Sequence, residues 1–394
     1  MPAAEAIREA LDSQLILRKM FEGSALLKKQ HGADNVFDFS LGNPDLPPPP
    51  AFYRVLQKLA REDKKGSHGY MPHAGLPEAR EALSRKIAAE QGVSLDASCV
   101  VMSCGAAGGL NVIFKSILNP GDEVIVSRPY FMEYRSYIAN YGGRIVEHDA
   151  LSDFSLDVAG IAAKLSPKTA AVLINSPHNP TGRIYPKETI AALADALAMH
   201  GKTCGRMPYL IADEPYREIA FDGIEVPPIL SAYPESMVVT SFSKSLSLPG
   251  ERIGYIAVNP EIDGKDELMD ALAYATRVLG FLNAPAFMQR AVAELSFAKV
   301  DVDVYARRRA AFTAMLDEVG MAYAKPEGAF FLFCKAPGWE DRAFVEHLSK
   351  HLIMGVPGSL FGMPGWLRFA YCVDEAIIRN SKAAFRKALE TWGN

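Results

Sequence analysis

Short apolar runs that alternate with helical patterns are the feature of this sequence that most constrains its fold. Seven runs follow one another in the central part of the chain: CVVMS (99–103), EVIVS (123–127), GRIVEH (143–148), AAVLIN (170–175), YLIAD (209–213), MVVTS (237–241) and IGYIAV (253–258). Between the first two, Leu110, Ile113 and Ile117 recur at helical spacing before NPG at 119–121 ends the pattern. Strand–helix alternation of this kind predicts the α/β class, with a mostly parallel seven-stranded sheet between helices.

The two ends of the chain follow a different pattern. Residues 5–31 show the apolar spacing of an amphipathic helix, and LGNPDLPPPP at 41–50 ends it, because successive prolines favour an extended, stiff connector. Longer helical stretches such as 285–318 follow later in the chain, and AFFLF at 329–333 predicts a strand. These ends therefore indicate a second, smaller α+β region.

The length of 394 residues is enough for two domains and a large buried core. We expect a large domain over residues 51–285 and a small domain built from both chain ends, residues 1–50 and 286–394. The net charge is −4, and the basic residues form no block or stripe. We therefore expect no nucleic-acid partner.

The N-terminal residues and the cysteines bear on the cellular compartment. Glu5, Arg8 and Asp12 interrupt any apolar core of a signal peptide, and no apolar run approaches the length that crosses a bilayer. The five cysteines form no CxxC pair and have no partnering histidine cluster, which indicates reduced thiols rather than a disulfide framework or a zinc site. We expect a cytoplasmic protein with no membrane partner and no metal.

Polar or small residues follow several of the apolar runs. In an open α/β sheet, ligands bind at the carboxyl ends of the strands, so these residues are the candidates for a site. They are Gly105, Ala106 and Ala107 in SCGAAGG, Phe131 in RPYFMEY, Asn179 in SPHNPTG, Asp213 with Tyr216, and Ser241 and Lys244 with Arg252 beyond them. SCGAAGG lacks the GK[ST] ending of a nucleotide-binding loop, so a nucleoside triphosphate is not expected.

Each candidate also has an ordinary structural explanation when it is taken alone. A small-residue turn packs helix against strand, Asp213 caps a helix, Asn179 makes a turn, Phe131 fills a core and Lys244 lies on the surface. Taken together at successive strand ends, the residues indicate one ligand, a phosphorylated pyridine aldehyde. Lys244 can form a Schiff base with the aldehyde, and Asp213 can keep the ring nitrogen protonated, which makes the ring an electron sink.

The remaining candidates suit the other parts of such a ligand. Asn179 and Tyr216 can hydrogen-bond the ring hydroxyl, and Phe131 can stack on the ring face. Ser241, Arg252 and the backbone N–H groups of residues 105–107 are expected to bind the phosphate. The N–H groups suit an anion because residues 105–107 begin a predicted helix.

These residues carry a resemblance to a known family. NPTG (179–182), DEPY (213–216), SFSK (241–244) and Arg252 resemble, in order and spacing, the signatures of the class I/II aminotransferases, pyridoxal-phosphate enzymes of the aspartate-aminotransferase fold. The resemblance covers nearly the whole chain. It implies pyridoxal 5′-phosphate as the cofactor and catalytic roles for Lys244, Asp213 and Tyr216.

The resemblance also implies partners and substrate contacts. Tyr70, in GYMPHAGLPEAR, resembles the tyrosine that reaches the cofactor phosphate of the neighbouring subunit, which implies a homodimer with shared sites. Arg368, in GWLRFAY, matches the arginine that grips the substrate α-carboxylate, with Asn179 nearby. Gly42, in LGNPD, matches the N-terminal segment that closes over the substrate.

The implied activity is ping-pong transfer of an amino group from an L-amino acid to a 2-oxo acid, with aspartate and aromatic donors as the leading options. Ala107 stands where some aspartate-specific relatives place a lysine. Arg277 and Arg135 are the candidates for binding a distal carboxylate. Without them, aromatic or aliphatic side chains fit Phe131, Tyr134 and Phe361 as neighbours.

Two other functions share this cofactor frame. Carbon–sulfur β-lyases break a different bond after the same carbanion, and product analysis distinguishes them from aminotransferases. The sensor module of a transcription regulator reuses the fold but carries an N-terminal DNA-binding domain. Only about forty residues precede the expected cofactor domain here, so this interpretation ranks last.

Overall fold

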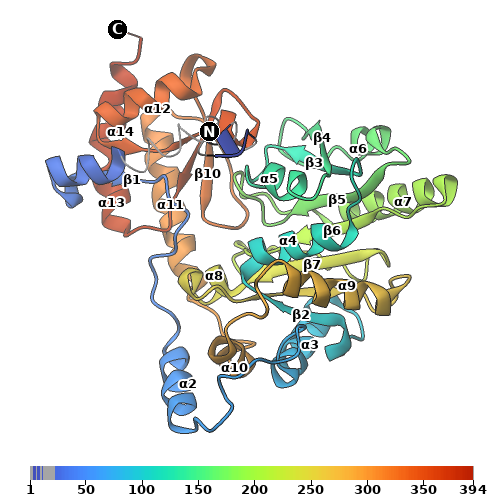
Figure 1. Ribbon diagram of the computed structural model, residues 1–394. Helices are drawn as coiled ribbons and strands as arrows, with labels where there is room; N and C mark the ends of the chain where they lie inside the picture. The colour runs from blue at the N-terminus through green and yellow to red at the C-terminus, as the bar shows by residue number, and fades with distance from the viewer. Residues whose placement is uncertain (1–2, 6, 9–10, 12–22, 394) are drawn as a thin grey trace. The chain divides into compact units, whose positions relative to one another are not determined.

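The computed structural model describes residues 3–5, 7–8, 11 and 23–393 (Figure 1). Contacts between residues divide the chain into two compact units. The large unit comprises Pro44–Val302 and Pro326–Ala329. The small unit comprises the described N-terminal residues up to Asn43, Asp303–Lys325 and the described residues from Phe330 onward.

A seven-stranded sheet forms the centre of the large unit, with the strand order β2-β8-β7-β6-β5-β3-β4. β8 is antiparallel to both of its neighbours, and the other pairs are parallel. The predicted mostly parallel sheet is confirmed, and each strand begins and ends within one residue of the predicted run. The strands are β2 (Val100–Ser103), β3 (Glu123–Arg128), β4 (Arg144–Asp149), β5 (Thr169–Asn175), β6 (Tyr209–Asp213), β7 (Ser236–Ser241) and β8 (Gly254–Val258).

Both faces of this sheet are covered, which explains why its central strands are almost continuously apolar rather than alternating. In β5, Val172 and Ile174 pack into a core on one face, while Ala171 and Leu173 pack into a core on the other. Helices α3, α6, α7 and α10 contribute to the first core, and α4, α5 and α9 contribute to the second. These helices are α3 (Pro77–Gln91), α4 (Gly105–Ile117), α5 (Tyr134–Ala139), α6 (Val158–Lys164), α7 (Lys187–Cys204), α9 (Lys265–Val278) and α10 (Ala286–Glu294).

The large unit contains the whole of the expected large domain and extends beyond it at both ends. The sequence assigns residues 286–302 to the small domain, whereas their contacts are with the large unit, where α10 packs against α3 and against α2 (Pro50–Arg61). The buried side chains of Met288 and Val292 on α10 make this contact favourable. The single helical stretch expected at 285–318 is thus divided into α10 and α11 (Val302–Val319).

The small unit is built around an antiparallel sheet of order β12-β13-β10-β9, with the predicted 329–333 strand observed as β10. A second, two-stranded sheet pairs β1 with β11 in parallel. Phe39, Phe312, Phe369 and Phe385 pack ring against ring in its core, with centroid distances from 4.7 to 6.1 Å. The elements are β1 (Phe37–Asp38), β9 (Tyr323–Ala324), β10 (Phe331–Lys335), β11 (Ile353–Met354), β12 (Val356–Pro357), β13 (Trp366–Ala370), α12 (Asp341–Lys350), α13 (Glu375–Asn380) and α14 (Lys382–Glu390).

The turn that joins β9 to β10, Pro326–Ala329, makes its contacts with the large unit. The backbone N–H groups of Glu327 and Gly328 both donate to the Gly182 carbonyl at 2.8 Å. The Glu327 carboxylate accepts from Arg183 Nη1 at 2.9 Å. These contacts lie within the large unit, to which the four residues of the turn belong.

Of the helix predicted over residues 5–31, residues 23–31 are helical, and most of the preceding span lies outside the described residues. The proline run at 47–49 has neither helix nor strand, and α2 begins at Pro50, because proline is tolerated in the first turn of a helix. Within the described part of the chain, no helix combines the length and apolar character needed to cross a membrane.

Candidate active site

Three neighbouring strands of the large sheet, β5, β6 and β7, end at the same edge. Asn175 at the end of β5 pairs in register with Asp213 at the end of β6, and Asp213 pairs with Val239 of β7. The chain then leads from β5 to Asn179, from β6 to Tyr216 and from β7 to Lys244. Parallel pairing therefore brings these three predicted site segments to one end of the sheet.

Asp213 is a buried carboxylate with one satisfied and one unsatisfied oxygen. Its Oδ2 accepts a hydrogen bond of 2.6 Å from the Tyr134 hydroxyl, and its Oδ1 has no hydrogen-bond partner among the described residues. Burial raises the pKa of Asp213 to about 7, the Tyr134 hydrogen bond opposes this rise, and the Glu214 charge adds to it. A buried oxygen in this condition is costly unless a ligand supplies a donor. A protonated ring nitrogen is such a donor.

Lys244 lies in α8 (Phe242–Ser245), a short helix that starts where β7 ends. Phe242 is buried and anchors this helix in the core, which leaves Lys244 half-buried. The Lys244 Nζ lies 5.9 Å from the centroid of the Tyr216 ring. The residue expected to bind the cofactor covalently and the tyrosine expected at the ring hydroxyl therefore lie side by side.

Asn175 organises this edge of the sheet and was not among the predicted site residues. Its Nδ2 donates to the backbone carbonyl of Asp213 at 2.7 Å, and its Oδ1 accepts from the backbone N–H of Asn179 at 2.7 Å. One buried side chain thus fixes both the Asp213 and the Asn179 segments. The signal for it in the sequence is an amide that ends the otherwise apolar run AAVLIN.

A second group of residues forms a cradle at the start of α4. Gly105 has a φ of 72°, and a Cβ added to it would lie 2.9 Å from Arg252 Nη2, so this position requires glycine. Arg252 donates from Nη2 to the Cys104 carbonyl at 3.3 Å and from Nη1 to the Pro249 carbonyl at 3.0 Å. The guanidinium and the first N–H groups of α4 are therefore adjacent, and together they suit a phosphate.

Gly254, which is not among the predicted site residues, allows this cradle to form beside β7. It pairs in register with Ser103 of β2 and with Ser241 of β7. A Cβ at Gly254 would lie 3.0 Å from the Gly105 Cα and 2.3 Å from the Thr240 carbonyl oxygen. Only Gly254, which has no side chain, thus lies between the Gly105 turn and Ser241, the residue expected to bind the phosphate.

Phe131 lies next to Asp213's hydrogen-bond partner. Its ring meets the Tyr134 ring edge-on, with 5.5 Å between centroids, and it is half-buried. The sequence interpretation treated Tyr134 only as a possible neighbour of the substrate. Its hydroxyl instead donates to Asp213, so Tyr134 belongs to the group around the carboxylate.

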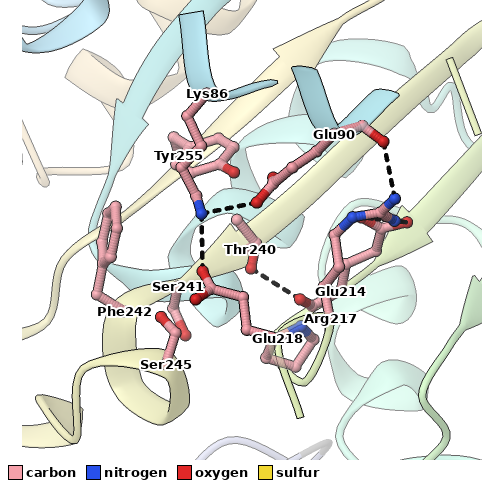
Figure 2. A pocket seen from close by; sticks show the side chains of 11 residues that line it. Lys86, Glu90, Glu214, Arg217, Glu218, Thr240, Ser241, Phe242, Ser245 and Tyr255 are labelled. Carbon is pink, nitrogen blue, oxygen red and sulfur yellow. Dashed lines mark hydrogen bonds and ion pairs between the residues drawn. The ribbon is translucent and has the colours of Figure 1, made fainter. Parts of the chain in front are cut away.

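Five charged side chains near these strand ends form a cluster that we call the polar cage: Lys86, Glu90, Glu214, Arg217 and Glu218 (Figure 2). The cage connects α3 to the turn after β6 and to β7. Lys86 Nζ lies 2.7 Å from a Glu90 oxygen and 2.8 Å from a Glu218 oxygen. Arg217 pairs with Glu214 at 3.0 Å. Burial raises the pKa of Glu214 to about 7, and Arg217 opposes the rise.

The cage contacts both the Asp213 and the Lys244 segments through the main chain. The Thr240 hydroxyl, one residue before Ser241, donates to the backbone carbonyl of Glu214 at 2.9 Å (Figure 2). The backbone N–H of Glu214 donates to the Val239 carbonyl, also at 2.9 Å. The segment that follows Asp213 and the segment that leads to Lys244 are therefore held together.

Two predicted residues of the small unit lie near one another within it. Arg368 on β13 is buried, and its Cζ lies 4.5 Å from the centroid of the Phe331 ring and 5.0 Å from that of Phe361. A Cβ added to Gly42 would lie 2.9 Å from atoms of the same Phe331 ring. Tyr70, in the large unit, is 91% exposed.

The structure does not place the two alternative arginines at the Asp213 group. Arg135 is 58% exposed at its side chain, forms an ion pair with Glu147 and donates from Nε to the Tyr130 hydroxyl at 2.6 Å. Arg277 lies in α9 and is exposed. The positive charge of Arg135 is thus already neutralised within the protein.

The residues present fit pyridoxal phosphate on two independent observations. The unsatisfied Oδ1 of Asp213 suits a protonated pyridine nitrogen. The Gly105–Arg252 cradle, at the start of a 13-residue helix, suits a phosphate group.

Comparison with known proteins shows the family of this chain. The sequence matches the aminotransferase class I and II family over residues 34–383. It is 31% identical to the aspartate/prephenate aminotransferase of Thermus thermophilus over 93% of this chain and 94% of that protein, and 28% identical to aromatic-amino-acid aminotransferase 2 of Thermococcus litoralis over 96% and 100%. An amino transferase structure from Eubacterium rectale aligns over 100% of both chains with 36% identity and a TM-score of 0.94.

The family match spans both units. The chain also covers nearly the full length of the two relatives named above. The chain belongs to the class I and II aminotransferase family and is a pyridoxal-phosphate-dependent aminotransferase.

Proposed function

We propose that this enzyme moves an amino group between an L-amino acid and a 2-oxo acid by a ping-pong mechanism, with aspartate or aromatic amino acids as the leading donors. The observation that carries the proposal is the buried Asp213 carboxylate, whose Oδ1 has no hydrogen-bond partner among the described residues. The donor classes come from the relatives, which are named for aspartate, prephenate and aromatic amino acids.

Each protein group has a definite task in this proposal. When bound, pyridoxal phosphate supplies an electron sink for the pair left at the substrate α-carbon. Asp213 keeps the ring nitrogen protonated, since a neighbouring negative charge favours the charged form. Lys244 Nζ would act as the general base that takes the proton from the substrate α-carbon, and then as the general acid that delivers this proton to the cofactor rather than back to the α-carbon.

Binding and orientation fall to other residues. Arg368 grips the substrate α-carboxylate through its planar fork of N–H donors, and the segment at Gly42 closes over the substrate. Asn179 and Tyr216 hydrogen-bond the ring hydroxyl, and Phe131 covers the ring face. Gly105, Ala106, Ala107, Ser241 and Arg252 hold the phosphate.

The proposal includes a cytoplasmic homodimer with shared sites, in which Tyr70 reaches the cofactor phosphate of the partner subunit. The 91% exposure of the Tyr70 side chain supports this role, because a large aromatic side chain exposed to this degree is available to another chain.

A donor panel tests the activity. The purified protein with pyridoxal phosphate is incubated with single L-amino acids and a 2-oxo acid, and the new amino acid is measured by chromatography. We expect aspartate or an aromatic donor to give the largest kcat/KM, and Lys244→Ala to give no transfer while it retains the wild-type circular dichroism. Release of ammonia and pyruvate without a new amino acid would support the β-lyase instead.

A further inference from the structure

A chain of partly and fully buried polar contacts in the small unit links its N-terminal helical residues to Arg368. Ser24 Oγ and Lys28 Nζ each donate to Asp38 Oδ2 at 2.6 Å. The Ser40 hydroxyl donates to Asp38 Oδ1 at 2.6 Å, and the Ser40 backbone N–H donates to the same oxygen at 3.2 Å. We call Ser24, Lys28, Asp38 and Ser40 the Asp38 cluster.

Ser40 carries the contact onward to Arg368. Its backbone carbonyl accepts a hydrogen bond of 2.8 Å from Arg368 Nη2, and both residues are buried. The guanidinium also lies against the rings of Phe331 and Phe361. Ring contacts restrict the tilt of a flat guanidinium but not its rotation within the plane, whereas a directional hydrogen bond to Ser40 fixes that rotation.

The Asp38 carboxylate is ionised in this setting. Burial acts to raise its pKa, but the hydrogen bonds from Lys28, Ser24 and Ser40 outweigh burial and hold the pKa below its ordinary value. Hydrogen bonds to a charged acceptor are stronger than those to a neutral one. Ser40 is therefore held at two points, its hydroxyl and its N–H, by a charged group.

We propose that Asp38 is a positioning residue for substrate binding: by fixing Ser40, it aims the guanidinium of Arg368 at the α-carboxylate of the amino acid. This inference rests on the proposed role of Arg368 as the carboxylate-binding residue. Asp38 does not touch the substrate in this account. It acts through the Ser40 carbonyl, and every link is a hydrogen bond within the small unit.

A purely structural role for Asp38 makes a different prediction. If Asp38 only ties the N-terminal helical residues to β1, its loss lowers the melting temperature and leaves the kinetics of the folded enzyme unchanged. If Asp38 aims Arg368, its loss weakens the binding of every donor that carries an α-carboxylate. The split between KM and kcat therefore distinguishes the two roles.

The test compares variants of the full-length enzyme with cofactor bound, using the donor that the panel finds best and a second donor with a different side chain. For Asp38→Ala we expect KM to rise about tenfold for both donors, with kcat within about twofold of wild type, because a grip lost equally from ground and transition states appears in KM. Asp38→Asn, which keeps one acceptor oxygen, is expected to give a smaller rise.

Two further variants keep the test decisive. Arg368→Ala sets the largest KM effect that loss of the grip can produce. Ser40→Ala removes only the hydroxyl contact with Asp38 and is expected to raise KM in the same direction, so it decides the matter if Asp38→Ala does not fold. The matched control is Asp34→Asn, an exposed acid in the same segment, which is expected to behave as wild type.

The outcomes separate the inference from the proposed function. If Arg368→Ala raises KM while the folded Asp38 and Ser40 variants leave it unchanged, the positioning role of Asp38 is wrong and the role of Arg368 stands. If Arg368→Ala itself leaves KM unchanged, the proposed grip is wrong and the inference is overturned with it. A KM rise for one donor only would also contradict the inference, because the α-carboxylate is common to both.

Discussion

Asp213 shows how burial shifts the protonation of a single carboxyl group. Burial raises the pKa of its carboxyl to about 7, while the Tyr134 hydroxyl donates to Oδ2 and opposes that rise. In the protein without cofactor, the carboxyl is thus close to the point at which it loses its proton near neutral pH. A cation at Oδ1 would favour the ionised form, so in the proposed role cofactor binding and ionisation of Asp213 would reinforce each other.

This pKa has a consequence for stability that can be measured. The folded-state pKa is above the unfolded value, so the folded protein binds the extra proton and Asp213 costs stability as the pH rises from about 4 to about 7. Asn cannot ionise. In the cofactor-free protein, we expect the free energy of unfolding of Asp213→Asn, relative to wild type, to rise by about 2 kcal/mol between about pH 5 and about pH 7.

Urea unfolding at several pH values checks this prediction, and the comparison with wild type matters. Burial lowers the pKa of His178 to about 3, which makes wild-type stability rise with pH over part of the same range. The difference between the two proteins removes that contribution, because His178 is present in both. A difference that stays constant from acid to neutral pH would show that Asp213 titrates normally.

Gly105 supports a second prediction at this scale. A side chain at this position meets a positive φ and the Arg252 guanidinium together. We expect Gly105→Ala to weaken pyridoxal-phosphate binding by at least about tenfold, since displacing Arg252 removes a charge-assisted phosphate contact. Absorbance titration of the cofactor-free protein measures this. The control is Gly250→Ala in the neighbouring loop, where a Cβ meets nothing within 4 Å, and its cofactor affinity should match wild type.

At the scale of elements, the strands were predictable and the polar cage was not. Each apolar run is bounded by turn residues, so the seven strand positions follow from local pattern, and the parallel arrangement then places Asn179, Asp213 and Lys244 at one edge. Lys86 and Glu90 on α3, in contrast, have the spacing of a solvated helix pair. Only the fold shows that the Lys86 side chain is 6% exposed and that Glu218 from another segment completes its environment.

Similar limits apply to the other residues that were missed. Asn175, Gly254 and the hydroxyl of Tyr134 act through partners distant in sequence, so no local pattern reveals their roles. The sequence motifs, in contrast, predict Lys244, Asp213 and the Gly105 turn as site residues, because the order and spacing of these motifs can be read from the chain itself. The assignment of α10 to the large unit likewise depends on its packing against α2 and α3, which the sequence of α10 does not reveal.

The cage gives a prediction for α3 as an element. Lys86→Met leaves Glu90 and Glu218 without their buried cation, and we expect a loss of about 3 kcal/mol in the free energy of unfolding, typical of breaking a buried ion pair. Urea unfolding near neutral pH measures this. Adding Glu218→Gln should recover part of the loss, because the unpaired charge is removed as well.

The comparison is with Lys58→Met, which removes an exposed pair with Glu294 and should change stability little. Equal effects of the Lys86 and Lys58 substitutions would mean that the cage is no more than a surface cluster. A cofactor-binding defect in the Lys86 variant alone would further support the connection of the cage to the Asp213 and Lys244 segments.

At the scale of the whole molecule, the proposed dimer with shared sites predicts complementation between inactive variants. Each site would use Lys244 of one subunit and Tyr70 of the other. Tyr70→Ala and Lys244→Ala homodimers should both be strongly impaired. After mixing and subunit exchange, half of the dimers are hybrids with one intact site, so about a quarter of wild-type activity is expected.

Activity assays after denaturation and refolding of the mixed variants measure this recovery. Refolding each variant alone provides the baseline, and analytical ultracentrifugation reports the assembly. If mixing restores no activity although hybrid dimers form, Tyr70 does not act across subunits. If the variants remain monomers, the proposed homodimer is wrong.

The hairpin formed by β9 and β10 has one more consequence. Hairpin tips are ordinarily where a protein accepts extra residues during evolution or in engineering, because little depends on their exact length. Here the tip, Pro326–Ala329, is fastened by the hydrogen bonds of Glu327 and Gly328 to Gly182 and by the ion pair with Arg183. Lengthening this loop would therefore disturb the turn that carries Asn179.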